Sequence, residues 1–158
     1  ESMFSIGDKV VYPMHGAGVI KTIEEKKILG DIKSYYILHI AHGSMQVMVP
    51  VDGAATGLRY IVDPPSIDRV KAVLEGESTP MDENWNRRNR ANMDKLKTGD
   101  ICQVAEVVRN LLRIDRVKKL STGEKKLLQN ARQVLASEIS LVLEIDENSA
   151  EEMIDSAV

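Results

Sequence analysis

The sequence contains few cysteine and aromatic residues. Its 158 residues include one cysteine, one tryptophan and one phenylalanine, and aromatic residues make up only 4%. Cys102 cannot form a disulfide within the chain, and no CxxC pair or Cys/His cluster surrounds it, so neither redox nor zinc chemistry is expected. No apolar run approaches the length of a bilayer span, and the N-terminus lacks a secretion signal. We therefore expect a cytoplasmic protein without a membrane segment.

Catalytic motifs are also missing. The sequence contains no GxSxG, HExxH, phosphate loop or GxGxxG. The three histidines, His15, His39 and His42, are scattered over turns and a strand, whereas a metal site needs ligands that converge. We expect a protein that is not an enzyme, with no metal, no cofactor and no small-molecule substrate.

The net charge of −3 hides a strong partition along the chain. Residues 1–83 carry 8 lysines and arginines against 12 acidic residues, residues 84–132 carry 13 against 5, and residues 133–158 carry none against 7. The middle of the chain, at net +8, is a candidate polyanion-binding region between two acidic ends.

The first part of the chain predicts β-strands. Short β-branched and aromatic runs at residues 8–13, 16–28, 33–41 and 45–51 are separated by Gly-containing turns. These strands are too few for a two-sheet sandwich, so we expect a small SH3-like barrel, closed or half-closed. The segment "VDPPS" at 62–66 then ends the β pattern, because consecutive prolines cannot donate to a sheet.

After residue 66 the apolar spacing changes from two residues to about 3.6. Ser66 is the expected N-cap of a first helix that Gly76 ends, and a second helix is expected from about Trp85 to Lys97. Three more are expected to begin at Asp100, at Ser121, which has the capping-box spacing to Glu124, and at about Asn148. The predicted class is α+β, with a β domain at 1–62 and an all-α bundle of about five helices at 66–158.

Trp85 is the first candidate functional residue. Tryptophan is usually a core residue, and a core position would require apolar residues at 88, 89 and 92 on the same helix face. Those positions hold Arg88, Asn89 and Asn92. We therefore expect Trp85 at the edge of the bundle, with at least one ring face open.

Cations form the second candidate site. Arg87, Arg88 and Arg90 follow the tryptophan, and Lys125 and Lys126 begin the fourth helix. Such runs are often only a solvated face, but within residues 84–98 only Asp94 could pair with them. Free arginines bind phosphates in a bidentate manner while an apolar wedge enters the minor groove. Further cations either extend this patch or form the outer face of a helix: Arg109, Arg113, Arg116, Lys118 and Lys119.

The order of several segments resembles the CarD/CdnL family of bacterial transcription regulators. These segments are "FSIGDKVVYPMHGAGVI", "VPVD", "NWNRRNRANMDKLKTGD", "VAEVVRNLLRID" and "LSTGEKKLLQNARQVLASEISL". The resemblance implies a Tudor-like N-terminal module, shared with the transcription-repair coupling factor, that binds the β subunit of RNA polymerase. It also implies a helical domain whose tryptophan and basic patch contact promoter DNA in the minor groove at the upstream edge of the bubble, with little base-specific reading. The expected outcome is a stabilised open complex, in a bacterial, nucleoid-associated protein.

Residue by residue, Trp85 falls on the wedge tryptophan of that family, and Arg87, Arg88 and Arg90 fall on the basic positions after it. Lys125, followed by Lys126, falls on another patch position. On the polymerase-binding face Lys26 matches a basic position, whereas Met48 stands where well-known members have arginine, which removes a charged contact there. An alternative of another class is an adaptor that does not bind DNA, whose basic helical domain meets an acidic protein partner.

Overall fold

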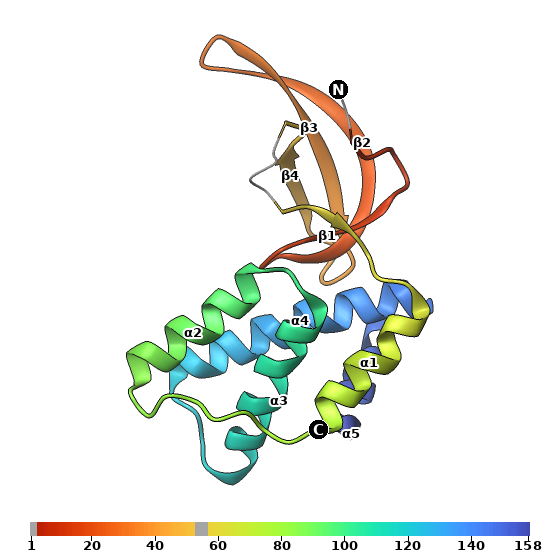
Figure 1. Ribbon diagram of the computed structural model, residues 1–158. Coiled ribbons are helices and arrows are strands. Elements are labelled where there is room, and N and C mark those ends of the chain that lie inside the picture. The colour runs from red at the N-terminus through yellow and green to blue at the C-terminus, as the bar shows by residue number, and fades with distance from the viewer. Residues whose placement is uncertain (1–2, 53–56) are drawn as a thin grey trace.

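The computed structural model describes residues 3–52 and 57–158, and it has a sheet followed by five helices (Figure 1). The strands are β1 (Lys9–Tyr12), β2 (Gly16–Ile28), β3 (Asp31–Ile40), β4 (Gln46–Pro50) and β5 (Arg59–Tyr60). The helices are α1 (Pro64–Glu75), α2 (Trp85–Lys97), α3 (Ile101–Val117), α4 (Thr122–Leu143) and α5 (Glu147–Ala157). The predicted α+β class is confirmed. Below, "β module" means the described residues up to 62 and "helical domain" means residues 63–158.

The β module is one antiparallel sheet in the order β4-β3-β2-β1-β5. Long strands β2 and β3 form a curved hairpin that projects from the molecule (Figure 1). The register shifts between Ile20 and Thr22, and such irregularities increase the local bend of a strand. Gly18 lies just before this bend, where an added Cβ would stand 2.3 Å from the carbonyl oxygen of His39, so only glycine fits. One face of the sheet contributes to a small buried core of Phe4, Val10, Ile20, Tyr36, Leu38, Ile40 and Val49.

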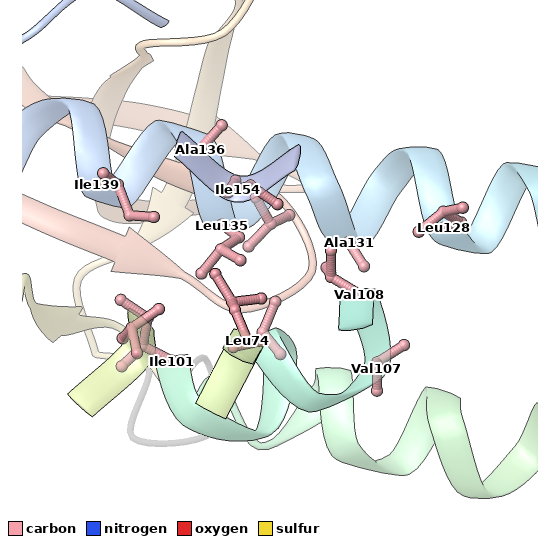
Figure 2. Packing of buried hydrophobic residues seen from close by; sticks show 14 of the residues in the cluster. Leu74, Ile101, Val107, Val108, Leu128, Ala131, Leu135, Ala136, Ile139 and Ile154 are labelled. Carbon is pink, nitrogen blue, oxygen red and sulfur yellow. The ribbon is translucent and has the colours of Figure 1, made fainter. Parts of the chain in front are cut away.

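The helical domain packs around α3 and α4, whose apolar positions recur at helical spacing. Figure 2 shows this core, with Leu74 from α1, Val107 and Val108 from α3, and Leu135 and Ile139 from α4. Ile154 of α5 closes it from the remaining side. A second core, separate from that of the β module, therefore supports the helices.

The start of α1 differs from the prediction. Asp63, not Ser66, is the N-cap, because its carboxylate accepts the backbone N–H of Ser66 at 3.1 Å. Pro64 and Pro65 occupy the first helical positions, where an N–H has no partner in the helix and the fixed φ of proline is already helical. The prolines thus begin the helix as well as ending the sheet. Gly76 follows the helix at its C-terminal cap, as predicted.

The other helices begin at short polar side chains. Asn84, Asp100, Ser121 and Asp146 each accept one or two backbone N–H groups of the first turn of α2, α3, α4 and α5. The bounds of α2 are those expected, and α5 begins at Glu147 rather than at Asn148. None of the helices that the structure describes is both long enough and apolar enough to cross a membrane.

The two parts meet where the C-terminal half of α4 contacts the beginning of β2. The N–H of Ala17 donates to Ser137 Oγ at 2.9 Å in a buried contact, and His42 Nδ1 lies 2.6 Å from Glu147 Oε1 at the start of α5. The chain passes between the parts through only Ile61, Val62 and Asp63. Both contacts join the β module to the C-terminal helices of the chain.

Candidate nucleic-acid interface

Trp85 is the first residue of α2 and lies at the edge of the helical domain. It is 45% exposed. Its indole Nε1–H donates to Ser121 Oγ at 3.3 Å, and its ring lies over Gly123, where an added Cβ would stand 3.5 Å from Cζ2. The start of α4 therefore holds one part of the indole while the rest stays in solvent.

The helix face of α2 that was predicted to face solvent is partly buried. Polar residues at 88, 89 and 92 were taken to mark a solvent face, but Asn92 is only 2% exposed and its amide lies 3.8 Å from Met81 Sδ. Arg88 and Asn89 are half-buried. The inner face of α2 can be polar because side chains from elsewhere in the fold bind its polar groups. Trp85 is exposed because it is the first residue of the helix.

The expectation that the arginines lack acidic partners was wrong for Arg87 and Arg88. Arg87 Nε donates to Asp82 at 2.9 Å, from the loop before the helix. Arg88 binds both carboxylate oxygens of Glu124, with Nε–Oε2 at 2.8 Å and Nη2–Oε1 at 2.9 Å. Both partners lie outside residues 84–98, and Glu124 is 36 positions from Arg88. A local count of acidic residues could not find them.

The Arg88–Glu124 pair joins a half-buried arginine to a buried carboxylate. The exposed fractions of the two side chains are 21% and 5%. Hydrogen bonds to the Glu124 carboxylate raise the pKa of Arg88 further above its ordinary range, so the guanidinium keeps its charge. This arginine is held by the protein and is not presented to solvent as a free cation.

Ser121 and Glu124 connect this pair to the tryptophan. Ser121 Oγ accepts the N–H of Glu124 at 3.3 Å, which is the first half of the predicted capping box. The Glu124 carboxylate binds Arg88 and lies 3.5 Å from the Ser121 hydroxyl, which also receives the indole N–H. Arg88, Glu124, Ser121 and Trp85 form one hydrogen-bonded set, called here the indole support. The sequence identified Ser121 and Glu124 only as a helix cap.

The remaining cations of the candidate site are open to solvent. Arg90, Lys125 and Lys126 are exposed and form no ion pair with any residue that the structure describes. Arg87 is 71% exposed despite its pair with Asp82, and surface pairs of this kind exchange easily with solvent. The contact between the starts of α2 and α4 brings these four cations to the same end of the helical domain as Trp85. We call the five residues the indole-end surface.

Three arginines predicted to extend this surface, or to form an outer helix face, have internal contacts instead. Arg109 is only 4% exposed, its Nη1 donates to the carbonyl of Val73 at 2.9 Å, and burial lowers its pKa. Arg113 donates to the carbonyl of Leu74 at 3.1 Å. Arg116 donates to two carbonyls at the C-terminal end of α5. These side chains join α3 to its neighbours, while Lys118 and Lys119 remain exposed.

The two residues predicted to contact the polymerase share one face of the sheet. Lys26 is paired in register with Lys33, and Met48 with Ile37. Positions 33 and 37 of β3 point to the same side because the side-chain period of a strand is two. Met48 is 44% exposed and belongs to β4, the strand at the end of the sheet. Lys26 is paired with Glu24 at 3.1 Å.

The histidines and the cysteine have separate environments. His15 stacks on Tyr12, and His42 contacts Glu147. Burial raises the pKa of the Cys102 thiol, which disfavours the reactive thiolate. Among residues 3–52 and 57–158 no three His, Cys, Asp or Glu side chains are placed to hold a metal ion.

Comparisons with known proteins cover nearly the whole chain. Residues 4–62 match the family model described as "CarD-like/TRCF RID domain", and residues 69–155 match the one described as "CarD, C-terminal domain". "Putative transcription factor YdeB" of Bacillus subtilis (strain 168) is 40% identical over 147 residues, which are 92% of this chain and 95% of that protein.

Proposed function

Since the chain belongs to the family of CarD-like transcription factors, we propose that it binds RNA polymerase through its β module and stabilises the open promoter complex through its helical domain. Residues 1–62 would be the polymerase-binding domain, and residues 66–158 the domain that contacts DNA. The proposed partner on the polymerase is the β subunit. No bond is made or broken in this activity, so it is a binding function.

One observation carries the proposal: Trp85 is 45% exposed at the N-terminal end of α2, near solvent-exposed lysines and arginines of two helices. An aromatic ring that is fixed on one side and open on the other suits insertion at an unstacked base step. Arg87, Arg90, Lys125 and Lys126 can meet phosphates on either side of that step. Because phosphate contacts and a wedge read no base edges, binding would depend little on DNA sequence.

Arg88 would act differently from its neighbours. Its guanidinium is already bidentate on the buried carboxylate of Glu124. Moving it to a phosphate would leave that carboxylate buried and unpaired, which costs several kcal/mol. We propose that Arg88 keeps the indole support in place and that the exposed cations make the phosphate contacts.

The effect on transcription would follow from differential binding. The wedge fits a base step that is already unstacked at the edge of the bubble, and it fits continuous duplex less well. Binding shifts an equilibrium only by the difference in affinity for its two states, so this contact would oppose collapse of the bubble. Attachment to polymerase would raise the local concentration enough for a weak DNA contact to matter.

The polymerase contact is proposed for the sheet face that carries Lys26 and Met48. The match to the "CarD-like/TRCF RID domain" supports this assignment. Methionine at 48 offers an apolar, adaptable contact in place of an ion pair, so shape and apolar burial would matter more than charge at that position.

The test is a promoter-opening assay with purified polymerase. We expect the protein to lengthen the lifetime of the open complex and Trp85→Ala to abolish most of that effect. Tyr60→Ala is the control, because Tyr60 is an aromatic residue of similar exposure, 56%, on a strand at the far end of the sheet from β4. An unchanged lifetime with Trp85→Ala, or an equal loss with Tyr60→Ala at unchanged polymerase affinity, would refute the role of the indole. Polymerase binding without affinity for forked DNA would instead favour the adaptor.

A further inference from the structure

Arg59 is the most completely bonded side chain at the junction of the β module with the helical domain. It belongs to β5, and all five of its N–H groups are used. Nη1 and Nη2 each donate to one oxygen of Glu138 at 2.8 Å, Nε and Nη2 donate to the carbonyl of Gly99 at 2.9 and 2.6 Å, and Nη1 donates to the carbonyl of Tyr60. One guanidinium thus joins β5 to α4 and to the turn between α2 and α3.

Glu138 completes this contact from the helical side. Its side chain is 3% exposed, and one of its oxygens also accepts the N–H of Val62 at 3.0 Å. The carboxylate therefore holds both the β strand and the segment that leaves it. Because the carboxylate is buried, moving the guanidinium away would leave its charge without a partner, so the pair favours one geometry.

Gly99, in the turn between α2 and α3, allows this turn to approach the β module closely. Its φ of +71° favours glycine, and an added Cβ would stand 2.8 Å from Cγ of Pro13 in the β module. The turn is pressed against Pro13 on one side and held by Arg59 on the other. The C-terminal end of α2 is therefore attached directly to the β module.

Trp85 stands at the opposite end of the same helix. In Figure 1 α2 runs away from the sheet, with its C-terminal end beside the β module. With 13 residues the helix is about 20 Å long. A rotation of roughly 10° at the junction would move its far end by about 3.5 Å, which is about one base step of DNA. Small freedom at Arg59 would therefore change which base step the indole reaches.

We propose that Arg59 and Glu138 are positioning residues that set the place of Trp85 relative to the polymerase-bound β module. They would contact neither DNA nor polymerase. They would couple the contact with polymerase to the contact with DNA. When the β module is bound to polymerase, the indole would be presented at one point of the DNA. This inference rests on the proposed function.

The first experiment measures the arrangement itself, without DNA or polymerase. Spin labels are placed at exposed Lys21 of β2 and exposed Ala91 of α2 by substitution with cysteine, in a Cys102→Ser background, and the distance distribution is recorded by pulsed electron resonance. We expect one narrow distribution for the parent protein and a clearly broader one for Arg59→Met.

Arg132→Met is the matched control. Arg132 binds Asp155 with two hydrogen bonds, at 3.0 and 2.6 Å, and its exposed fraction of 28% is close to the 29% of Arg59. That pair lies within the helical domain, so its loss should leave the distance distribution narrow. A distribution that stays narrow in Arg59→Met, or broadens equally in Arg132→Met, would overturn the proposal.

The second experiment measures the coupling. We expect Arg59→Met to keep the separate affinities for polymerase and for forked DNA but to shorten the open-complex lifetime about tenfold, since a tether that holds its module in the right place contributes about 10²–10⁴ in avidity. A mere loss of stability would lower both separate affinities as well. If Arg59→Met broadens the spin-label distance distribution but leaves the open-complex lifetime as long as that of the parent protein, the proposal is also overturned. Glu138→Gln, which keeps the shape and removes the charge, serves if Arg59→Met does not fold, and the same outcomes apply to it.

The two proposals can fail separately. If the parent protein does not lengthen the open-complex lifetime, the proposed function fails, while the spin-label distances still report whether Arg59 fixes the arrangement. If the parent protein does lengthen it and Arg59→Met does so equally, only the positioning role fails.

Discussion

The exposure of a single side chain, Trp85, predicts how much its truncation should lower stability. Truncating a buried tryptophan to alanine costs about 3–5 kcal/mol. Trp85 is 45% exposed, so only about half of the indole surface is buried, and we expect Trp85→Ala to lower the free energy of unfolding by about 2 kcal/mol. Urea denaturation measures this value.

Leu96→Ala in the same helix is the comparison, because Leu96 is 3% exposed and its truncation should cost about 2–5 kcal/mol. A loss for Trp85→Ala of the full 3–5 kcal/mol expected for a buried tryptophan would mean that the indole is a core residue.

Arg88 and Arg87 are adjacent in sequence but should differ sharply in their contribution to stability. Arg88→Met leaves the carboxylate of Glu124, which is 5% exposed, without its partner, and we expect a loss of about 3 kcal/mol. Arg87→Met removes only an exposed pair with Asp82 and should cost less than about 1 kcal/mol. Equal losses in chemical denaturation would contradict the assignment of Arg88 to the indole support.

The sequence placed Trp85 at the start of a helix and located the start of α4, because helix starts depend on local capping residues. It could not pair Arg88 with Glu124 or Arg59 with Glu138, since those contacts join residues 36 and 79 positions apart. One signal was present: Glu138 interrupts an apolar stretch of α4, and a carboxylate among buried residues needs a partner.

At the level of secondary structure, the aspartate caps of α1 and α5 make stability sensitive to pH. Asp146 accepts the backbone N–H of Ser149 at 2.7 Å, and this bond lowers its pKa below the ordinary 3.8. A hydrogen bond to the Ser66 side chain, together with its backbone N–H, likewise lowers the pKa of Asp63. These bonds favour the ionised form in the folded state only.

Because the folded-state pKa lies below the unfolded one, the stability contributed by Asp146 is fully present above about pH 4 and is lost as the pH falls through the folded-state pKa. We expect the free energy of unfolding to fall with pH in this acidic range, and to fall less steeply in Asp146→Asn, since asparagine caps a helix as well without a charge. Asp94→Asn, on the exposed side of α2, is the control. An unchanged slope in Asp146→Asn would contradict this role of the cap.

The ends of helices were predicted best where only one nearby residue could cap the helix. The bounds of α2 and the caps at Asp100 and Ser121 agree with the structure. The cap of α1 was misplaced because Asp63 and Ser66 are both capping residues and two prolines separate Asp63 from the apolar pattern. Proline suits both the end of a strand and the first turn of a helix, so composition alone did not decide between them.

For the whole molecule, the partition of charge predicts how DNA affinity should respond to salt. Four open cations on the indole-end surface correspond to a slope of about −3 to −4 in a plot of log affinity against log salt concentration. Lys125→Gln should reduce the slope by about one. Lys71→Gln, at an exposed position of α1, should leave the slope unchanged. Titration of forked DNA at several salt concentrations tests this, and a flat response would exclude phosphate contacts as the source of affinity.

The shortness of the connection between the two parts has a consequence for the strength of their interface. Only Ile61, Val62 and Asp63 separate β5 from α1, a span of at most about 10 Å. A tether this short gives the facing surfaces an effective concentration in the millimolar range or above. The Arg59–Glu138 contact therefore needs only millimolar intrinsic affinity to stay mostly formed. If it opens, it closes again as a unimolecular step, independent of how much of the protein the cell contains.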